Sequence, residues 1–266
     1  MKKTIGLLLF LALPFTSVAA ADLTAILSGD HRSVENRQRD EFRHPRETLD
    51  FFAIDSTMTV MEVWPGAGWY TEILAPLLKD EGKLYAAHFS SDSPVPYFNK
   101  VRKEFIEKLG ADPVVYGNVD VVEFNPGSGV LDVADSSVDR VVTFRNVHNW
   151  LRDNSEEQAF ALFYKVLKPG GMLGVVEHRA PPGKDRQWML DNGYMTEAAV
   201  IELAEKAGFK LVAKSEINAN PLDKSDHPAG VWSLPPTLRL GDTDREKYSA
   251  IGESDRMTLL FRKAEQ

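Results

Sequence analysis

The sequence predicts an α/β domain built on a mostly parallel sheet, and three observations lead to this prediction. From Thr59 onward, short runs rich in β-branched residues alternate with amphipathic stretches, which is typical of βαβ units. A glycine-rich turn at residues 64–68 follows the first of these runs, where a strand would give way to a helix. The 266 residues are 43% hydrophobic and 26% charged, within the ordinary globular range, so one sizeable core is expected.

Seven strands are expected, with helices on both faces of the sheet. The strand candidates are the short β-branched runs at residues 59–63, 83–87, 114–116, 138–144, 172–177, 210–216 and 257–261. The main helix candidates carry apolar residues at three-to-four spacing and cover residues 70–79, 97–109, 155–167 and 196–207. Because the two kinds of element alternate, sequential strands are predicted to run mostly parallel.

Other segments precede or interrupt this pattern. Residues 22–57 mix charge with sparse apolar positions and predict an N-terminal helical extension, followed by the main domain over residues 58–266. Residues 218–256 are rich in Pro, Asp and Ser and predict a long insertion before the last strand, either a lid or binding loop or a solvated surface excursion. The polar stretches 39–47 and 223–228 have two similar interpretations, closure over a pocket or an ion-paired surface.

Residues 1–21 have the layout of a secretory signal peptide. Two lysines precede an apolar run at residues 5–15, and small residues follow, with cleavage expected after Ala20 or Ala21. The apolar run is shorter than the roughly 20 residues that a membrane-spanning helix needs, so cleavage is preferred over an uncleaved anchor. The predicted product is periplasmic or secreted and has no membrane association after cleavage.

Composition excludes several classes of protein and of site. No cysteine is present, so there is no disulfide framework, no thiolate metal site and no lipidated cysteine behind the signal. The formal charge is −8, or −10 without the two lysines of the signal, and no long basic run follows, which argues against a nucleic-acid partner. The six histidines never fall at a zinc-like spacing such as H-E-x-x-H, and G-x-S-x-G is absent, so neither a metal site nor a serine hydrolase is predicted.

The most informative segment is the glycine turn Glu62-Val63-Trp64-Pro65-Gly66-Ala67-Gly68. Glycine lets the backbone bend tightly and approach a ligand closely, and the helix that follows offers free N–H groups and a positive dipole to an anion. The third glycine of the dinucleotide fingerprint G-x-G-x-x-G is missing, because Trp69 and Tyr70 follow the second. A nicotinamide-dependent dehydrogenase is therefore the poorer interpretation.

This segment resembles the first motif of the class I S-adenosylmethionine (SAM)-dependent methyltransferases, in which an acidic residue lies near the end of the first strand and a glycine turn faces the methionine part of SAM. Three later segments resemble further motifs of that family: residues 135–142, 167–173 and 204–209. The resemblance implies a Rossmann-like class I methyltransferase fold with SAM as cofactor. More narrowly, residues 64–70 and 145–150 look like a bacterial group of predicted exported methyltransferases.

The resemblance implies roles for several residues in binding SAM. Gly66 and Gly68 would line the methionine site, and Glu62 would orient the SAM amino group or the turn itself. In the family, the second strand usually ends in an acid that binds both ribose hydroxyls; here His88 stands at that place and could accept one such bond, or Asp92 could reach back. Asn118 or Asp120 stands near the adenine-binding position after the third strand, and Asn118 could bind the adenine amino group through its side-chain oxygen. A turn residue chosen for its backbone is the alternative.

The segment Phe144-Arg145-Asn146-Val147-His148-Asn149-Trp150 falls where open α/β sheets place their chemistry, outside the carboxyl ends of the strands. His148 is the candidate general base for removing a proton from a methyl acceptor, and a structural histidine is the alternative. Arg145 and Asn146 are candidates for holding the substrate or the SAM carboxylate. Four aromatic residues flank the two turns and suit adenine stacking or cation–π contact, with core packing as the alternative: Trp64, Trp69, Tyr70 and Trp150.

These residues predict a SAM-dependent methyltransferase that acts on a small molecule or an exported metabolite. The alternative, from a different class, is a periplasmic binding or scaffold protein that retains the fold without methyl transfer. Two points favour that alternative: no acid ends the second strand, and SAM is made in the cytoplasm whereas the chain carries a predicted export signal. The methyl acceptor, its accepting atom and the oligomeric state do not follow from the sequence.

Overall fold

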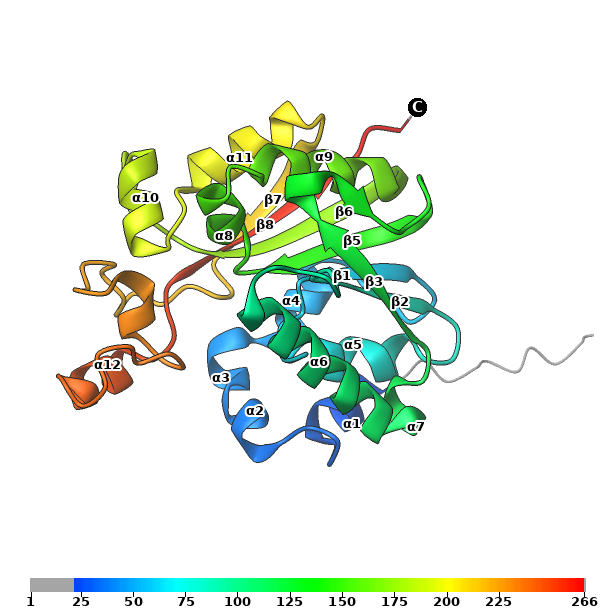
Figure 1. The fold of residues 1–266 in the computed structure, drawn as a ribbon, viewed down its shortest axis with the longest axis horizontal. Coiled ribbons are helices and arrows are strands. Elements are labelled where there is room, and N and C mark those ends of the chain that lie inside the picture. The colour runs from blue at the N-terminus through cyan, green and yellow to red at the C-terminus, as the bar shows by residue number, and fades with distance from the viewer. Residues whose placement is uncertain (1–21, 266) are drawn as a thin grey trace, which may run out of the picture.

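The computed structural model describes residues 22–265, so the predicted signal peptide at residues 1–21 lies outside the described residues. An eight-stranded sheet in the order β4-β3-β2-β1-β5-β6-β8-β7 forms the centre of the molecule (Figure 1). The strands are β1 (Thr59–Val63), β2 (Lys83–His88), β3 (Val119–Asn125), β4 (Val130–Leu131), β5 (Val138–Phe144), β6 (Leu167–His178), β7 (Lys210–Ser215) and β8 (Arg256–Arg262). The predicted α/β class is confirmed, with one strand more than expected.

Five neighbouring strands at the centre of the sheet run parallel: β3, β2, β1, β5 and β6. Strand β8 pairs antiparallel with both β6 and β7, and the short β4 pairs antiparallel with β3 at the other edge. The carboxyl ends of the parallel strands therefore point to one side of the sheet, which is where ligands bind in open α/β folds.

Helices cover both faces of the sheet, as predicted (Figure 1). One face carries α8 (Val147–Arg152), α9 (Glu156–Val166), α10 (Arg186–Asn192) and α11 (Glu197–Lys206). The other carries α1 (Leu23–Ser28), α4 (Pro45–Phe51), α5 (Thr71–Leu78) and α7 (Pro113–Tyr116). The remaining helices are α2 (Val34–Gln38), α3 (Asp40–Arg43), α6 (Pro96–Ala111), α12 (Arg245–Ile251) and the 3₁₀ turns η1 (Pro126–Ser128) and η2 (Gly230–Ser233). None of the described helices is long and apolar enough to cross a membrane.

The N-terminal extension packs onto the sheet. Helix α4 buries Leu49, and Phe52, which follows the helix, is fully buried in the core on the α5 face. A Cβ on Gly174 of β6 would come within 2.8 Å of three atoms of the Phe52 ring. Glycine at this strand position therefore makes room for the extension.

The third strand differs from the prediction. Residues 114–116 form part of the short helix α7 rather than a strand, and β3 begins at Val119. Asp112 caps this helix by accepting a hydrogen bond from the Val115 N–H at 3.1 Å, and Pro113 occupies the first helical position. A three-residue apolar run does not distinguish strand from helix, whereas the Asp-Pro start signal does.

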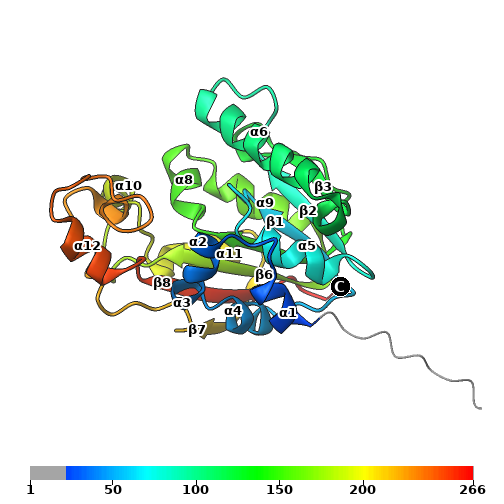
Figure 2. The ribbon, with the colours of Figure 1, turned by 90° about the horizontal axis from the view of Figure 1, so that it is seen from below.

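The insertion at residues 218–256 lies beyond the ends of β6 and β8 and is tied to the domain by a buried carboxylate (Figure 2). Asp223 accepts hydrogen bonds from the Tyr194 hydroxyl at 3.0 Å and from the His227 ring at 2.8 Å. The backbone N–H of Asp255, next to β8, donates to the same carboxylate at 2.8 Å. A buried acid with this many donors holds the part of the insertion around Asp223 to the segment between α10 and α11, whereas residues 241–247 of the insertion are exposed.

Candidate functional site

A cavity of about 840 Å³ opens at the carboxyl side of the parallel strands. Its walls include the glycine turn after β1, the turn after β5, arginines from α3 and its amino end, aromatic residues of α6 and part of the insertion. The volume lies in the range that proteins use for small molecules and cofactors. The insertion contributes Trp232, Pro235 and Arg239 to the wall, in agreement with the binding-loop interpretation.

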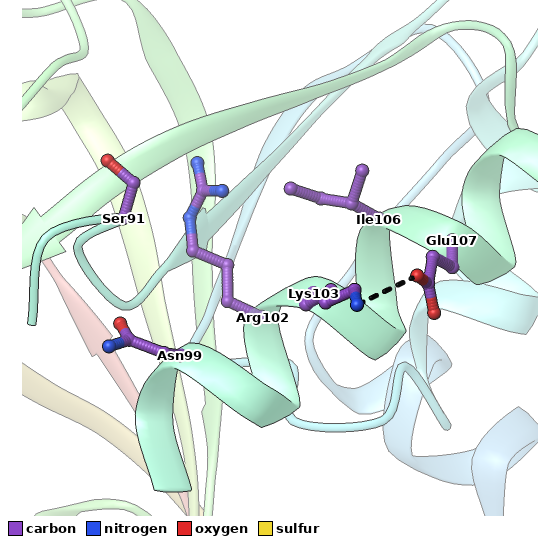
Figure 3. Close-up of a pocket in the computed structure, with 6 residues that line it drawn as sticks. All are labelled: Ser91, Asn99, Arg102, Lys103, Ile106 and Glu107. Carbon is purple, nitrogen blue, oxygen red and sulfur yellow. Dashed lines mark ion pairs between the residues drawn. The ribbon is translucent and has the colours of Figure 1, made fainter. Parts of the chain in front are cut away.

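A second, smaller hollow of about 400 Å³ lies on the outer side of α6 (Figure 3). Its lining residues are all exposed or half-buried, and among them Lys103 and Glu107 form an exposed ion pair at 3.7 Å. Exposed pairs of this kind contribute little free energy, and this hollow has no buried polar group in its wall. We therefore place the functional site in the larger cavity.

The glycine turn has three residues in the left-handed backbone region: Trp64 (φ +46°), Gly66 (φ +59°) and Gly68 (φ +80°). A Cβ on Gly66 would meet no protein atom within 4 Å, so the backbone there faces open space in the cavity wall. A Cβ on Gly68 would meet the Phe105 ring at 3.0 Å, so this glycine allows α6 to pack against the turn. Gly66 therefore borders the cavity, whereas Gly68 lies behind it.

Side chains from three elements fix the glycine turn from behind. They donate hydrogen bonds to successive parts of its backbone: His88 Nε2 to the Gly66 oxygen (3.3 Å), Lys108 Nζ to the Ala67 oxygen (3.0 Å) and Asn146 Nδ2 to the Val63 oxygen (2.9 Å). Asn146 Nδ2 also lies 3.1 Å from Thr143 Oγ1. Asn146 thus lies in the cavity wall, and its amide nitrogen is used to hold β1, which leaves its oxygen for a ligand.

His88 supports the turn and is not placed to bind ribose. Its Nδ1 accepts the Phe89 N–H at 2.8 Å, which requires that Nε2 carries the proton and donates to the Gly66 carbonyl. Burial lowers the pKa of His88 to about 4, so the ring stays neutral at physiological pH. Because both ring nitrogens are engaged, the expected hydrogen bond from His88 to a ribose hydroxyl is wrong.

Asn118 lies away from the cavity. It immediately precedes β3, at the amino end of the strand, and its side-chain amide donates to the Lys79 carbonyl at 2.9 Å. The expectation that it contacts adenine is therefore wrong, and the cause is the misplaced third strand. At the carboxyl end of β3, Asn125 Oδ1 accepts a hydrogen bond from the Ser128 N–H at 3.4 Å and caps η1.

The aromatic residues near the two turns divide between the core and the cavity. Trp150 is fully buried among hydrophobic residues, as core packing predicts. Trp64 is half-buried in the cavity wall, donates its indole N–H to the Phe124 carbonyl at 3.2 Å and packs against Phe89 with ring centroids 4.7 Å apart. The Trp64 and Phe89 rings therefore form an apolar part of the wall beside the glycine turn.

Glu62 brings a buried carboxylate to the wall beneath the glycine turn. Its Oε2 accepts a hydrogen bond from the Thr71 hydroxyl at 2.6 Å, and only 2% of the residue is exposed. Burial raises the pKa of Glu62 to about 7, although the Thr71 hydrogen bond and the charge of Lys108 oppose this rise. A buried acid of this kind is well suited to pair with an ammonium group, which would restore its ionised form.

His148 also lies in the cavity wall and is held by a buried carboxylate. Its Nδ1 is 3.0 Å from Glu177 Oε1, and Glu177 also accepts the backbone N–H groups of Val147 (2.6 Å), His148 (3.3 Å) and His178 (2.7 Å). Because the carboxylate accepts, Nδ1 carries the proton and Nε2 keeps a lone pair. His148 is thus arranged as a general base in the cavity wall, with Glu177 fixing its tautomer.

Sequence reasoning missed Glu177, although an acid at the carboxyl end of a central strand was a usable signal. His148, Glu177 and His178 have potential metal-ligating atoms within 4.8 Å of one another. Four hydrogen bonds already occupy the Glu177 oxygens, and His178 Nδ1 is hydrogen-bonded to the Ser254 hydroxyl. We therefore assign Glu177 to positioning His148 rather than to metal binding.

The cavity fits the methionine part of SAM and offers apolar surface for its base. The open face at Gly66 leaves room beside the turn, and Glu62 is available to the ammonium group. The Trp64 and Phe89 rings suit stacking against adenine. No acid stands at the end of β2 to accept hydrogen bonds from the ribose hydroxyls, so the turn, Glu62 and the aromatic wall are the candidate contacts for SAM.

The raised pKa of Glu62 predicts a pH-dependent stability difference between the wild-type chain and Glu62→Gln. A carboxyl with a folded-state pKa of about 7 and an unfolded value of 4.5 contributes stability below pH 4.5, and this is lost as the pH rises through 7. From pH 5 to pH 8 the wild type should lose about 2 kcal/mol relative to Glu62→Gln, as measured by urea unfolding. A difference that stays constant across this range would contradict the raised pKa.

Comparison with known proteins finds relatives that match about half of the chain. No family model matches. The ubiquinone/menaquinone biosynthesis C-methyltransferase UbiE of Klebsiella pneumoniae subsp. pneumoniae is 29% identical over 136 residues, which is 51% of this chain and 49% of that protein. UbiE of Escherichia fergusonii is 27% identical over the same share of each chain. The chain thus spans about half the length of the curated relatives it matches.

Solved structures share the fold over most of the chain. A SAM-dependent methyltransferase from Aquifex aeolicus is 20% identical and covers 74% of this chain and 93% of its own, with a TM-score of 0.55. A SAM-dependent methyltransferase from Methanosarcina mazei is 11% identical and covers 82% and 97%, also with a TM-score of 0.55. The [4+2]-cyclase SpnF is 17% identical and covers 90% and 86%, with a TM-score of 0.58, so this fold also carries other chemistry.

Sequence similarity over half of the chain and structural similarity over most of it agree. The expected Rossmann-like fold is confirmed, and SAM is the cofactor named for the similar structures. The chain has the fold of the class I SAM-dependent methyltransferases and is related in sequence to the UbiE C-methyltransferases.

Proposed function

We propose that this protein is a SAM-dependent methyltransferase that acts on a small-molecule acceptor. The observation that carries the proposal is the shared cavity, whose wall contains both the open glycine turn at Gly66 and the base His148. The curated relatives are named for carbon methylation in quinone biosynthesis. Because the chain matches only about half of their length, we propose a small-molecule acceptor for it and do not propose the quinone substrate of those relatives.

The chain's own residues supply alignment and proton transfer. When bound, SAM would supply an electrophilic methyl group for in-line attack by the acceptor. The fixed glycine turn and Glu62 hold the amino-acid end of the cofactor, which sets the direction of attack. His148 Nε2 accepts the proton that the acceptor loses, and Glu177 holds the ring and stabilises the imidazolium that results.

Cofactor binding is tested by calorimetric titration of the purified chain with SAM and S-adenosylhomocysteine. Gly66→Val fills the open face of the turn and strains a left-handed residue, so affinity for S-adenosylhomocysteine should fall at least about tenfold. Gly110→Val is the matched control, because its Cβ also meets no atom within 4 Å but lies on α6, outside the cavity. If the folded wild type releases no heat and shows no thermal shift with either ligand, the proposal is wrong.

The role of His148 is tested with His148→Asn. Labelled methyl transfer from SAM is first screened against small phenols, thiols and amines. With an acceptor found in this way, the variant should bind S-adenosylhomocysteine as the wild type does and transfer methyl about 10²–10⁴ times more slowly. Glu177→Gln should also slow transfer, because the amide no longer enforces the donor at Nδ1. Turnover of His148→Asn at the wild-type rate would exclude the base.

For location, we propose export to the periplasm or beyond, on the basis of the signal-like residues 1–21. Removal of the signal should leave Ala21 or Asp22 as the first residue. Amino-terminal sequencing of protein recovered from fractionated cells tests this, with a cytoplasmic marker enzyme as control. Recovery in the cytoplasmic fraction with Met1 retained would contradict export.

A further inference from the structure

Four arginines from distant parts of the chain line one wall of the cavity around a single carboxylate. Arg39 and Arg43 come from the start and end of α3, Arg145 from the turn after β5, and Arg256 from the first position of β8. Glu253 Oε1 lies 2.6 Å from Arg39 Nε, and Glu253 Oε2 lies 3.2 Å from Arg43 Nε and contacts Arg256. One negative charge therefore faces four positive charges.

The charges in this cluster are not balanced by the protein groups around them. Burial raises the pKa of Glu253, but the charges of Arg256, Arg43, Arg145 and Arg39 outweigh this and hold it well below its usual range. The carboxylate is therefore ionised and contributes a single negative charge. Burial and the neighbouring Arg256 lower the pKa of Arg145 to about 10, which reflects the same surplus. Arginine stays protonated at neutral pH, so the surplus of positive charge persists.

Several donors of the cluster also lack an acceptor within the described residues. Arg39 Nη2, Arg43 Nη2 and Arg256 Nε are buried without a hydrogen-bond partner there, and Arg43 and Arg256 are each only 2% exposed. Arg145 has no side-chain hydrogen bond or ion pair within residues 22–265, and its backbone is held in the left-handed region at φ +63°. Buried unpaired donors and charges are costly, so this arrangement favours an anion from outside the chain.

SAM cannot balance the positive charge of the arginines. Its methionine part has one carboxylate and one ammonium, and its sulfonium adds a positive charge, so the molecule as a whole is a cation. Binding SAM alone would leave the cavity more positive than before. An anionic group on the second ligand of the cavity would balance this charge.

We propose that Arg43, Arg145 and Arg256 form a subsite for a multiply charged oxyanion carried by the methyl acceptor, either a phosphate ester or a polycarboxylate. Guanidinium groups bind such oxyanions through paired N–H donors, which also fixes their orientation. The inference rests on the methyltransferase proposal, because it assigns the acceptor side of that cavity.

The position of the cluster relative to the base supports this assignment. The rings of His148 and His178 have centroids 5.2 Å apart, and His178 is buried next to the arginines. Burial lowers the pKa of His178, and the charges of Arg145, Arg256 and Arg43 contribute to the same shift. An acceptor anchored by its anion on the arginines would thus have its remaining part beside His148.

The experiment uses the purified full chain and two probes, inorganic phosphate and citrate, titrated calorimetrically in a chloride buffer with and without saturating S-adenosylhomocysteine. The wild type should bind at least one probe saturably, and Arg145→Gln should weaken that binding at least about tenfold. Arg145→Lys, which keeps the charge, should restore part of it. Arg262→Gln is the matched control, since Arg262 is exposed at the opposite end of β8 from Arg256.

The outcomes separate the anion subsite from the methyltransferase proposal. Unchanged affinity for S-adenosylhomocysteine in Arg145→Gln, together with loss of the probe, supports an acceptor subsite. Equal loss of both would overturn it, because the cluster would then serve the cofactor carboxylate. No binding of either probe by a wild type that binds S-adenosylhomocysteine also overturns it and leaves methyl transfer standing. If the chain binds a probe but does not bind S-adenosylhomocysteine, the result supports an anion site and contradicts the assignment of SAM as cofactor.

Arg145→Gln is expected to fold, because the wild-type side chain makes no hydrogen bond within the described residues. Far-UV circular dichroism and the melting temperature check this. Arg39→Gln provides a second variant, since the Arg39 side chain is 24% exposed and its loss removes one charge of the cluster from the rim. It should weaken probe binding less than Arg145→Gln does, and an equal or larger effect would overturn the assignment of Arg145 to the centre of the subsite.

Discussion

The arrangement of the cavity depends on the buried carboxylate of Glu177. It stands at the end of β6 and accepts hydrogen bonds from two N–H groups at the start of α8, one from the next residue of its own strand and one from the His148 ring. This single group fixes the position of α8, the direction of His148 and the proton on its Nδ1. A carboxylate that satisfies so many donors is rigid, and removing it would leave them unpaired in a buried region.

Two groups in the cavity wall have opposite electrostatic character. Below the glycine turn, burial makes the ionised form of Glu62 costly until a cation is present. The arginines around Glu253 make their part of the wall positive in a chain whose net charge is −8. A cationic cofactor and an anionic acceptor would each balance the charge of the group that it meets, and this would orient the two ligands.

The segments outside the central sheet complete the site. Helix α3 brings Arg39 and Arg43 to Glu253, more than 200 residues further along the chain, and the insertion brings Trp232 and Arg239 to the same cavity. Asn218 donates to Thr48 of α4 and Thr258 of β8 at 3.0 Å, which joins the extension to the last strand. The extension and the insertion therefore both contribute to the walls of the cavity.

The sequence alone determined the features that depend on neighbours along the chain. β1 and β5 have the predicted bounds, the glycine turn follows β1, and His148 lies beside the cavity. These features follow from the spacing of apolar residues, the residue types in turns and the positions of strand ends, all of which depend on residues close together in the sequence. The third strand was misplaced, because a short apolar run is ambiguous until it pairs with a neighbour.

Only the tertiary structure decided the roles of His88, Glu177 and the arginines. His88 meets the Gly66 carbonyl across 22 residues, Glu177 meets His148 across 29, and Arg43 meets Glu253 across 210. Whether a polar side chain binds a ligand or braces the backbone depends on which groups fold around it. That choice is made by burial and hydrogen bonding between distant segments, so a local pattern such as an acid at a strand end marks a candidate position without giving its partner.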